Sequence, residues 1–344
     1  MHHLRRTKKN QKNQKNHKNH KNHKNHKNHK NHKKHKRTHK KHKKTHKKYH
    51  KIQKGKGTQW ESVKCSPKNG DQLNFKTCFT ADSLHKLKTI WNARHPDVLV
   101  KSNDPEEIWN KLRSYMSKSC NTEKCWLRHQ CIKNDIDMFL WDSSFAPKSP
   151  ATWVKKSNKW LNSLDIERVM KQYERVYKCF DFIGPSPIDF DKHMLWGECV
   201  WEELCKFQLK DQIIKDKTKI GIIFNLDKHT EDGSHWVAMF INIKTQEIYY
   251  FDSYGDKPPK LILNFVKRVQ SQGEELNLKF EFDHVSNRHQ YSNSECGMFS
   301  LFFIIELLKD TKNFNDFQNK KFSDKYMKKL RKIYFNPHTS KDLM

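Results

Sequence analysis

The stretch that decides the fold of this chain is Gln290-Tyr-Ser-Asn-Ser-Glu-Cys296-Gly297-Met-Phe-Ser300. A polar turn precedes the cysteine and an apolar run follows it as far as Leu308, which predicts a buried helix beginning at Cys296. The N-terminal end of a helix carries partial positive charge and favours the thiolate, the form of cysteine that attacks a carbonyl carbon. The side-chain amide of Gln290, six residues upstream, is placed to donate to an oxyanion.

A base and an orienting acid for this cysteine are expected on a β-hairpin earlier in the chain. A run of strand-forming residues is entered at His235 and reaches Ile243, and a second run from Ile248 to Phe251 ends at Asp252. In a hairpin the start of the first strand lies beside the end of the second, so His235 and Asp252 should meet at one edge of the sheet. Asp252 would then accept a hydrogen bond from one imidazole nitrogen while the other nitrogen faces a thiol.

In this order and spacing the residues resemble the ubiquitin-like-protein (SUMO) protease clan, which includes the adenovirus maturation protease and the thiol proteases of large DNA viruses. A His-Trp pair comes first, Asp252 follows His235 by 17 residues, and a Cys-Gly pair follows Gln290 by six. The motifs match over residues 183–305 and more loosely over 120–335. Four further segments strengthen the viral side of the comparison: Cys125-Trp-Leu127, Pro147 to Trp153, Gly184 to Phe190, and Phe224 to Asp227.

The resemblance implies a role for each residue of the pattern. Cys296 is the nucleophile, and His235 is the base that takes its proton and later the acid that protonates the leaving amine. Asp252 holds the imidazole tautomer, and Gln290 stabilises the oxyanion together with the backbone N–H of Cys296. Trp236 covers a narrow tunnel that admits only small residues before the scissile bond, as in clan members that cut after Gly-Gly. No cofactor or metal belongs to such a site.

The implied function is a cysteine endopeptidase that cleaves after small residues and matures viral structural proteins. Its expected location is the virion and the viral factory in the host cytoplasm or, if the chain is not viral, an intracellular compartment. Two alternatives stay open: an enzyme that releases ubiquitin-like modifiers from conjugates, and a non-catalytic nucleic-acid-associated protein on a protease fold. The complete set of four residues argues against the second alternative, because decay of an enzyme usually loses a member.

Each residue of the pattern also has an ordinary structural interpretation. A free cysteine is commonly a small buried hydrophobe, and an Asp before Ser-Tyr-Gly is a common turn former. Two other histidines, His284 and His289, lie close enough to Gln290 in sequence to compete as the base. We favour His235 because it has an acid partner in predictable register and they do not.

Most of the net charge of +31 lies in an N-terminal tail. Residues 1–59 contain 24 Lys and Arg and no acid, and the triplet His-Lys-Asn repeats from His17 to His32. Such a segment buries too little apolar surface to offset chain entropy, so it is expected to be disordered. It suits binding of DNA, RNA or another polyanion, as the stimulation of adenoviral relatives by DNA suggests, or it is an expanded repeat without a selected role.

The rest of the chain is predicted to hold two parts. Residues 60–182 are predicted to form a mainly helical extension, with helices at Ala81–Asn92, Asp104–Ser117, Asn134–Phe139 and Ser163–Tyr177. Residues 183–344 read as an α+β catalytic domain, a twisted mixed sheet with the nucleophile helix packed on it. Beside the hairpin and the Cys296 helix, this domain is expected to contain helices at His193–Phe207 and Pro259–Gln270 and strands at Lys219–Phe224 and Lys279–His284. The apolar run to Leu308 is too short to span a membrane.

The nine cysteines are an odd number and no secretory signal is recognisable, which predicts a reducing compartment without a disulfide framework. A cluster that has the residue types for zinc lacks a Cys-x-x-Cys pair, so a structural use is favoured for its members, Cys120, Cys125, His129 and Cys131. Cys199 and Cys205 are expected in the core, on one face of an amphipathic helix.

Overall fold

The computed structural model describes residues 63–68, 73–130 and 135–338, and the predicted basic tail lies outside these ranges. Side chains are described except between residues 129 and 138. Residues 56–344 form one compact unit, which contains every described residue.

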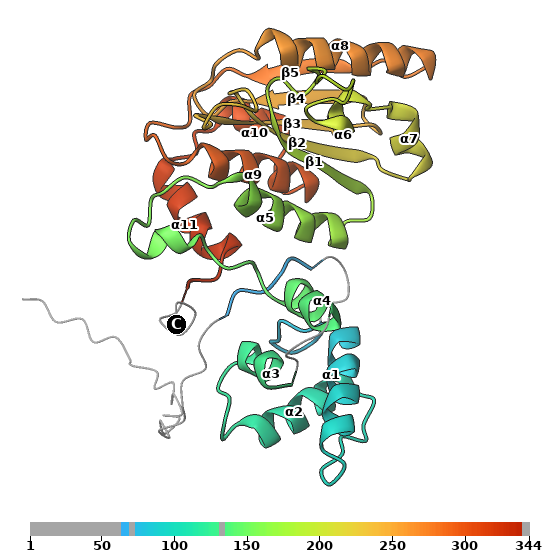
Figure 1. Ribbon diagram of the computed structural model, residues 1–344, viewed down its shortest axis with the longest axis vertical. Coiled ribbons are helices and arrows are strands. Elements are labelled where there is room, and N and C mark those ends of the chain that lie inside the picture. Colours follow the sequence, from blue (N-terminus) through green and yellow to red (C-terminus); the bar gives the residue numbers. More distant parts are fainter. Residues whose placement is uncertain (1–62, 69–72, 131–134, 339–344) are drawn as a thin grey trace, which may run out of the picture. The chain divides into compact units, whose positions relative to one another are not determined.

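A mixed five-stranded sheet forms the centre of the catalytic part (Figure 1). Its strands follow one another in chain order, β1 pairing with β2 in parallel, β2, β3 and β4 antiparallel, and β4 pairing with β5 in parallel. This arrangement confirms the predicted α+β fold. The strands are β1 (Phe180–Pro187), β2 (Lys219–Asn225), β3 (Trp236–Asn242), β4 (Glu247–Phe251) and β5 (Glu281–Val285).

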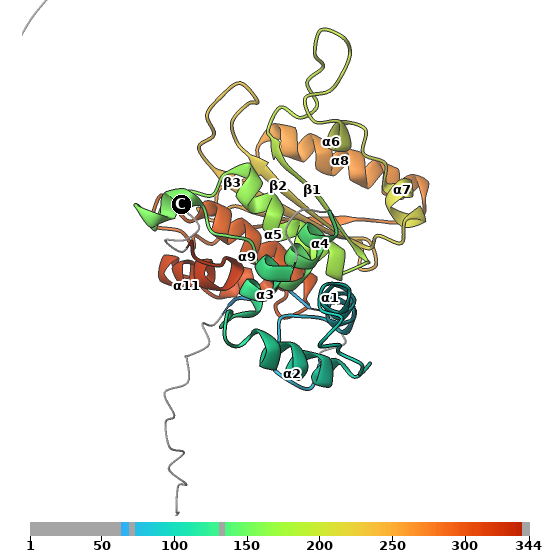
Figure 2. The ribbon, with the colours of Figure 1, turned by 60° about the horizontal axis from the view of Figure 1, so that its bottom comes forward.

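Helices cover both faces of the sheet (Figures 1 and 2). One face packs on α9 (Cys296–Leu308) and α5 (Ser163–Val176), and the other packs on α8 (Lys260–Glu275), with α6 (Glu202–Cys205) and α7 (Leu209–Ile214) nearby. Helix α9 is buried on all sides between the sheet, α5 and α11 (Asp324–Tyr334), which explains why its sequence is apolar almost throughout. A short helix, α10 (Phe314–Asn319), connects α9 to α11.

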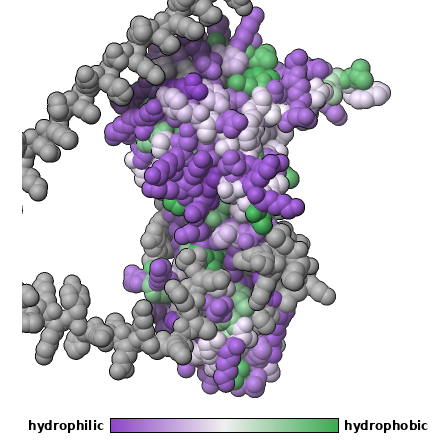
Figure 3. Space-filling model, turned by 90° about the vertical axis from the view of Figure 1, so that its left-hand side faces the viewer, coloured by the Kyte–Doolittle hydropathy of each residue, from purple (hydrophilic) through white to green (hydrophobic). Residues whose placement is uncertain are grey.

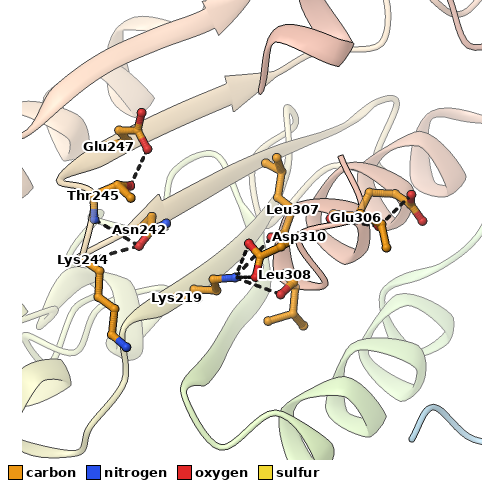
Figure 4. Close-up of polar contacts among 10 residues, drawn as sticks. Lys219, Asn242, Lys244, Thr245, Glu247, Glu306, Leu307, Leu308 and Asp310 are labelled. Carbon is orange, nitrogen blue, oxygen red and sulfur yellow. Dashed lines mark hydrogen bonds and ion pairs between the residues drawn. The ribbon is translucent and has the colours of Figure 1, made fainter. Parts of the chain in front are cut away.

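The C-terminal end of α9 is fixed to the sheet by one lysine (Figure 4). Lys219, at the start of β2, donates to the carbonyl oxygen of Leu308 over 3.0 Å and pairs with Asp310 at 2.7 Å. A cation at this position satisfies carbonyl groups that have no partner inside the helix and complements the helix dipole. Helix α9 is therefore anchored at the end opposite to Cys296.

The N-terminal helical part has a core of its own, in which Phe79, Trp126 and Phe145 are fully buried. Its helices are α1 (Ala81–Arg94), α2 (Pro105–Met116), α3 (Glu123–Gln130) and α4 (Asp135–Ser144), followed by the 3-10 helix Ala151–Val154. The predicted start of α2 is confirmed: Asp104 caps it by accepting from the N–H of Glu107, and Pro105 takes the first helical position.

The predicted helix over His193–Phe207 is wrong. Only α6 is helical there, while His193 and Cys199 form an isolated bridge around a tight turn that contains Gly197 at φ +81°. A turn of this kind closes the backbone hydrogen bonds locally, which overrides the helical spacing of the apolar residues. Strand β1 was not predicted, because Gly184, Pro185 and Pro187 read as strand breakers, and the predicted boundary between residues 182 and 183 falls inside it.

The prediction of a chain without disulfides is also wrong. Disulfides join Cys65 to Cys78, Cys120 to Cys125 and Cys199 to Cys205, which leaves Cys179 and Cys296 as the free cysteines among the described residues. Each pair is separated by 13 residues or fewer, so local turns bring the sulfurs together without any long-range contact. The cluster for which a structural use was favoured over zinc is divided in this way: Cys120 and Cys125 are bonded to each other, and His129 and Cys131 lie outside the described side chains.

None of the helices in the described ranges has the length and apolar character that crossing a membrane requires.

Candidate active site

The hairpin of β3 and β4 places His235 beside Asp252, as predicted from the sequence. His235 directly precedes β3, Asp252 directly follows β4, and Ala238 pairs with Phe251 in the antiparallel register. The imidazole Nε2 lies 2.8 Å from Oδ1 of Asp252. Asp252 is only 1% exposed, so this hydrogen bond forms away from water, where it is stronger than at a surface.

Cys296 begins α9 and its side chain lies beside the imidazole of His235. Because Asp252 occupies Nε2 of the imidazole, Nδ1 is the nitrogen left available to the thiol. Burial of the ring opposes its protonation, but the hydrogen bonds and charges of Asp252 and Cys296 outweigh burial and raise the pKa of His235 to about 9. The imidazole therefore holds its proton at neutral pH, between the carboxylate of Asp252 and the side chain of Cys296.

Tyr254 is a member of the site that the sequence analysis missed. Its ring stacks on the imidazole of His235, with centroids 4.7 Å apart and an interplanar angle of 18°, and its backbone N–H donates to Oδ1 of Asp252 over 2.8 Å. Burial and the neighbouring Cys296 raise the pKa of its phenol. Gly255 allows the turn, because its φ is +79° and a Cβ there would lie 2.7 Å from the carbonyl oxygen of Ser286. The signal in the sequence that could have identified Tyr254 was the presence of an aromatic residue two positions after Asp252.

Gln290 is completely buried and tied to the same turn. Its side-chain oxygen, Oε1, accepts from the hydroxyl of Ser253 over 2.7 Å, and its backbone N–H donates to the backbone carbonyl oxygen of Ser253. Its side-chain Nε2 donates to the carbonyl oxygen of Ser292 over 2.6 Å and to the hydroxyl of Tyr254 over 3.3 Å. Since both amide hydrogens have acceptors, donation to an oxyanion would replace the longer of these two bonds, the one to Tyr254.

Helix α11 holds the loop between Gln290 and Cys296 at two points. At its N-terminus, Asp324 accepts from the backbone N–H groups of Tyr291 and Ser292, each over 3.0 Å. One turn before its end, Arg331 pairs with Glu295 at 2.8 Å, and the two side chains are 5% and 0% exposed. The sequence analysis did not predict α11, although Met327, Leu330 and Tyr334 have helical spacing.

Arg331 also connects this loop to the segment before α5. Its guanidinium donates to the carbonyl oxygen of Ser294 over 2.9 Å and to that of Lys159 over 2.8 Å, and it lies 4.2 Å from the ring centroid of Trp153. The buried charge is thus satisfied by a carboxylate, by carbonyl groups and by an aromatic face, the arrangement that a buried arginine requires.

Trp236 lies against the first turn of α9 and is 7% exposed. Its indole N–H donates to the carbonyl oxygen of Leu161 over 3.0 Å. A Cβ on Gly297 would come within 3.2 Å of Leu161 and 3.3 Å of Trp236, so glycine permits this close packing beside Cys296.

The two competing histidines lie elsewhere. His289 is fully buried, its Nε2 lies 3.0 Å from the carbonyl oxygen of Phe317, and its Nδ1 accepts from the backbone N–H of Phe322. Burial lowers its pKa, which keeps the ring neutral with both nitrogens engaged. His284 lies on β5, the edge strand, in register with Tyr250.

Known proteins of two kinds resemble this chain. It is 28% identical over 297 residues to a protein of Acanthamoeba polyphaga mimivirus named as a thiol protease, a match that covers 80% of this chain and 94% of that protein. It is 26% identical over 245 residues to a SUMO-1 cysteine protease of African swine fever virus, covering 67% and 89%. The crystal structure of an African swine fever virus protease superposes with a TM-score of 0.55 at 20% identity, over 80% of this chain and 96% of that one. In addition, residues 201–343 match the YopJ serine/threonine acetyltransferase family.

The relatives, the mixed sheet and the cysteine beside a paired histidine define the chain as a thiol protease. Within that class it is similar to viral proteases, among them one named as a SUMO-1 cysteine protease. The match to an acetyltransferase family is chemically compatible with this, because a cysteine that forms an acyl-enzyme serves either hydrolysis or transfer, depending on the group that accepts the acyl.

Proposed function

We propose that this thiol protease is an endopeptidase that cleaves proteins after small residues and matures structural proteins of a virus. The observation that carries the proposal is the position of His235 between the carboxylate of Asp252 and the thiol of Cys296. A thiolate beside an imidazolium that a buried acid orients is the arrangement that nucleophilic attack on a peptide carbonyl requires.

In the proposed reaction His235 already holds the proton of Cys296, and the thiolate sulfur bonds to the scissile carbonyl carbon. The oxyanion that forms accepts hydrogen bonds from Nε2 of Gln290 and from the backbone N–H of Cys296, which has no acceptor inside its own helix. When the carbonyl re-forms, the C–N bond breaks and the amine takes the proton of His235. Water then gives a proton to His235 and attacks the thioester, which releases the carboxylate product and restores the thiol.

The packing around Gly297 supports a preference for small residues before the scissile bond. Trp236 and Leu161 close over the first turn of α9, next to Cys296, and the hydrogen bond between them keeps this wall in place. A substrate residue with a large side chain would have to displace buried groups, which is costly in a close-packed environment.

The viral relatives support maturation of structural proteins as the role, in the virion and in the viral factory of the host cytoplasm. Release of ubiquitin-like modifiers is the second candidate, since the African swine fever virus relative is named a SUMO-1 cysteine protease. The basic tail, residues 1–59, is proposed to bind nucleic acid or another polyanion.

The deciding experiment offers the purified protein two substrate sets: virion precursor proteins with Gly-Gly sites, and conjugates of ubiquitin-like modifiers. We expect cleavage of the precursors after Gly-Gly, and none by the Cys296→Ala variant, which should keep its fold by circular dichroism. Cleavage of the conjugates alone would identify a deconjugase. Labelling of a Ser or Thr of the substrate from an acetyl donor, without cleavage, would show an acetyltransferase and refute the proposal.

The tail is tested separately by deleting residues 1–59. Cleavage of a short peptide should be unchanged, while affinity for duplex DNA should fall and lose most of its salt dependence. Unchanged DNA affinity after the deletion would refute a binding role for the tail.

A further inference from the structure

A cavity of about 810 Å³ lies between α11 and the segment before α5, outside the catalytic site. Trp153 and Phe335 form an aromatic wall, with ring centroids 5.3 Å apart in an edge-to-face arrangement. Lys64, Lys328, Lys332 and His338 line it as well, and we call it the basic pocket. Its volume is in the range of pockets that bind a ligand or a few peptide side chains.

The pocket carries lysine charges that no acid in the described structure pairs with. None of its described lining residues is an acid, and the ammonium groups of Lys328 and Lys332 have no hydrogen-bond or ion-pair partner among the described residues. Of the described basic residues that line it, Arg331 alone is paired with a carboxylate, that of Glu295. Nδ1 of His338 is buried without a hydrogen-bond partner in the part of the chain that the structure describes. A site of this kind favours a ligand with carboxylate groups.

Helical spacing creates the cationic side of the pocket. Lys328, Arg331, Lys332 and Phe335 follow one another at intervals of three, one and three residues, which places them on one stripe of α11 and its C-terminal extension. Lys329 falls on a different side of the same helix and does not line the pocket. The stripe therefore presents two free lysines and one aromatic ring to the same cavity.

The pocket is connected to the proposed cleft through Arg331. This residue lines the pocket, and its guanidinium reaches Glu295 and Ser294 beside the nucleophile as well as the carbonyl oxygen of Lys159. From Lys159 the chain continues to Leu161, which holds Trp236. The segment of residues 157–161 thus runs from the pocket to the wall of the cleft.

We propose that the basic pocket is an exosite for the protein substrate, which binds an acidic segment carrying an apolar side chain upstream of the scissile bond. The proposal rests on the endopeptidase function proposed above. Carboxylates of the segment pair with Lys328 and Lys332 at the rim, and the apolar side chain packs against Trp153 and Phe335 inside.

Distance sets which part of the substrate reaches the pocket. Residues before the scissile bond lie along Trp236 and Leu161 in the proposed cleft, and Asn158, three residues back from Leu161, lines the pocket. An extended chain covers at most about 3.5 Å per residue, so three residues span about 10 Å. The segment that enters the pocket should therefore begin about four to six positions before the scissile bond.

The shape of the pocket favours a peptide over nucleic acid as its occupant. One face of the Trp153 ring is covered by the guanidinium of Arg331, and the ring of Phe335 is inclined to it by 70°, so the two rings do not form parallel platforms for successive bases. The side of the molecule where α11 lies is mainly hydrophilic in its described part, with hydrophobic residues only in separate spots (Figure 3). A recessed apolar wall behind free lysines suits a short acidic segment with a single apolar anchor.

The test measures kcat/KM for three peptides that share one Gly-Gly cleavage site. The first carries Glu and Leu upstream, the second has Gln in place of Glu, and the third has Ser in place of Leu. The full chain and two double variants are compared: Lys328→Glu/Lys332→Glu at the pocket, and Lys325→Glu/Lys329→Glu as a control of equal charge on the same helix. Because the basic tail is identical in all three proteins, it cannot cause a difference in kcat/KM between the two double variants.

We expect the full chain and the control to cleave the first peptide roughly tenfold faster than the second. The pocket variant should lose this difference through KM while it cleaves the uncharged peptide normally. Equal preference for the acidic peptide in both double variants would overturn the exosite. It would also be overturned if an oligonucleotide displaced the peptide and this displacement required Lys328 and Lys332.

Failure of the proposed function gives a different result. If the full chain cleaves no peptide, fluorescence anisotropy of the labelled first peptide with the Cys296→Ala variant still reports on the pocket. Weaker binding after Lys328→Glu/Lys332→Glu, but not after the control substitutions, would then retain the site and refute the endopeptidase. Equal binding in both would overturn the exosite.

Discussion

Replacement of Arg331 by methionine tests how firmly α11 holds the nucleophile loop. The substitution keeps much of the side-chain volume but leaves the carboxylate of Glu295, which is 0% exposed, without its cation. It also removes hydrogen bonds to the carbonyl oxygens of Ser294 and Lys159. Breaking a buried ion pair from one side costs about 3–5 kcal/mol, because the remaining charge stays in a medium that cannot solvate it. For a folded part of this size, the melting temperature should fall by about 10 °C.

The assay is urea unfolding followed by tryptophan fluorescence, together with kcat/KM on a short peptide. We expect Arg331→Met to lose stability and activity together, and Arg331→Lys to be intermediate, since an ammonium cannot make the forked contacts of a guanidinium. The double variant Glu295→Gln/Arg331→Met should be more stable than Arg331→Met alone, because it no longer buries an unpaired charge. A loss below about 1 kcal/mol for Arg331→Met would refute the reasoning, since a pair of that value is typical of an exposed surface.

Three further predictions concern the proposed base, its rejected competitor and the anchor of α9. Because the pKa of His235 is raised to about 9, kcat/KM should fall as pH rises through about 9. The stability that protonated His235 contributes should be complete below pH 6.5 and lost as pH rises through about 9. A fall in kcat/KM near pH 7 would contradict the ion pair with Cys296. His289→Ala should lower the melting temperature but keep most of the activity of the folded fraction. His235→Ala should abolish the activity of the folded fraction and should also lose the stability that the pair with Asp252 contributes. Equal losses of activity in the folded fractions would make His289 the base. Lys219→Met should lower the free energy of unfolding in urea by about 1 kcal/mol, because it removes the cap of α9 (Figure 4). The control Lys244→Met, on the neighbouring turn where the hydrogen bond comes from the backbone N–H, should leave the free energy of unfolding unchanged. Equal effects of the two substitutions would refute the capping role.

The sequence predicted what depends on local pattern. The pairing of His235 with Asp252 follows from hairpin geometry, and the start of α9 follows from the change from a polar turn to an apolar run. Caps such as Asp104 marked helix starts correctly. These features need only a few neighbouring residues, so one sequence contains the information.

The features that were missed depend on contacts between distant segments. Arg331 pairs with Glu295 from 36 residues away, and it bonds the carbonyl of Lys159 from 172 residues away, so no local pattern identifies its partners. Tyr254 became part of the site through stacking on His235, a contact that the order of residues alone does not reveal. Strand β1 formed despite Gly184 because that glycine lies against the backbone of Ile223, where a side chain would not fit.

The contacts between α11 and the loop from Gln290 to Cys296 have a consequence for the stage of synthesis at which the site can form. His235, Asp252 and Cys296 are all translated before Asp324 and Arg331, yet the loop that carries the nucleophile is held by these two later residues. A nascent chain that ends after α9 contains all three side chains but lacks the helix that fixes their geometry. We therefore expect the loop before Cys296 to take its final geometry only after α11 has been made and has docked.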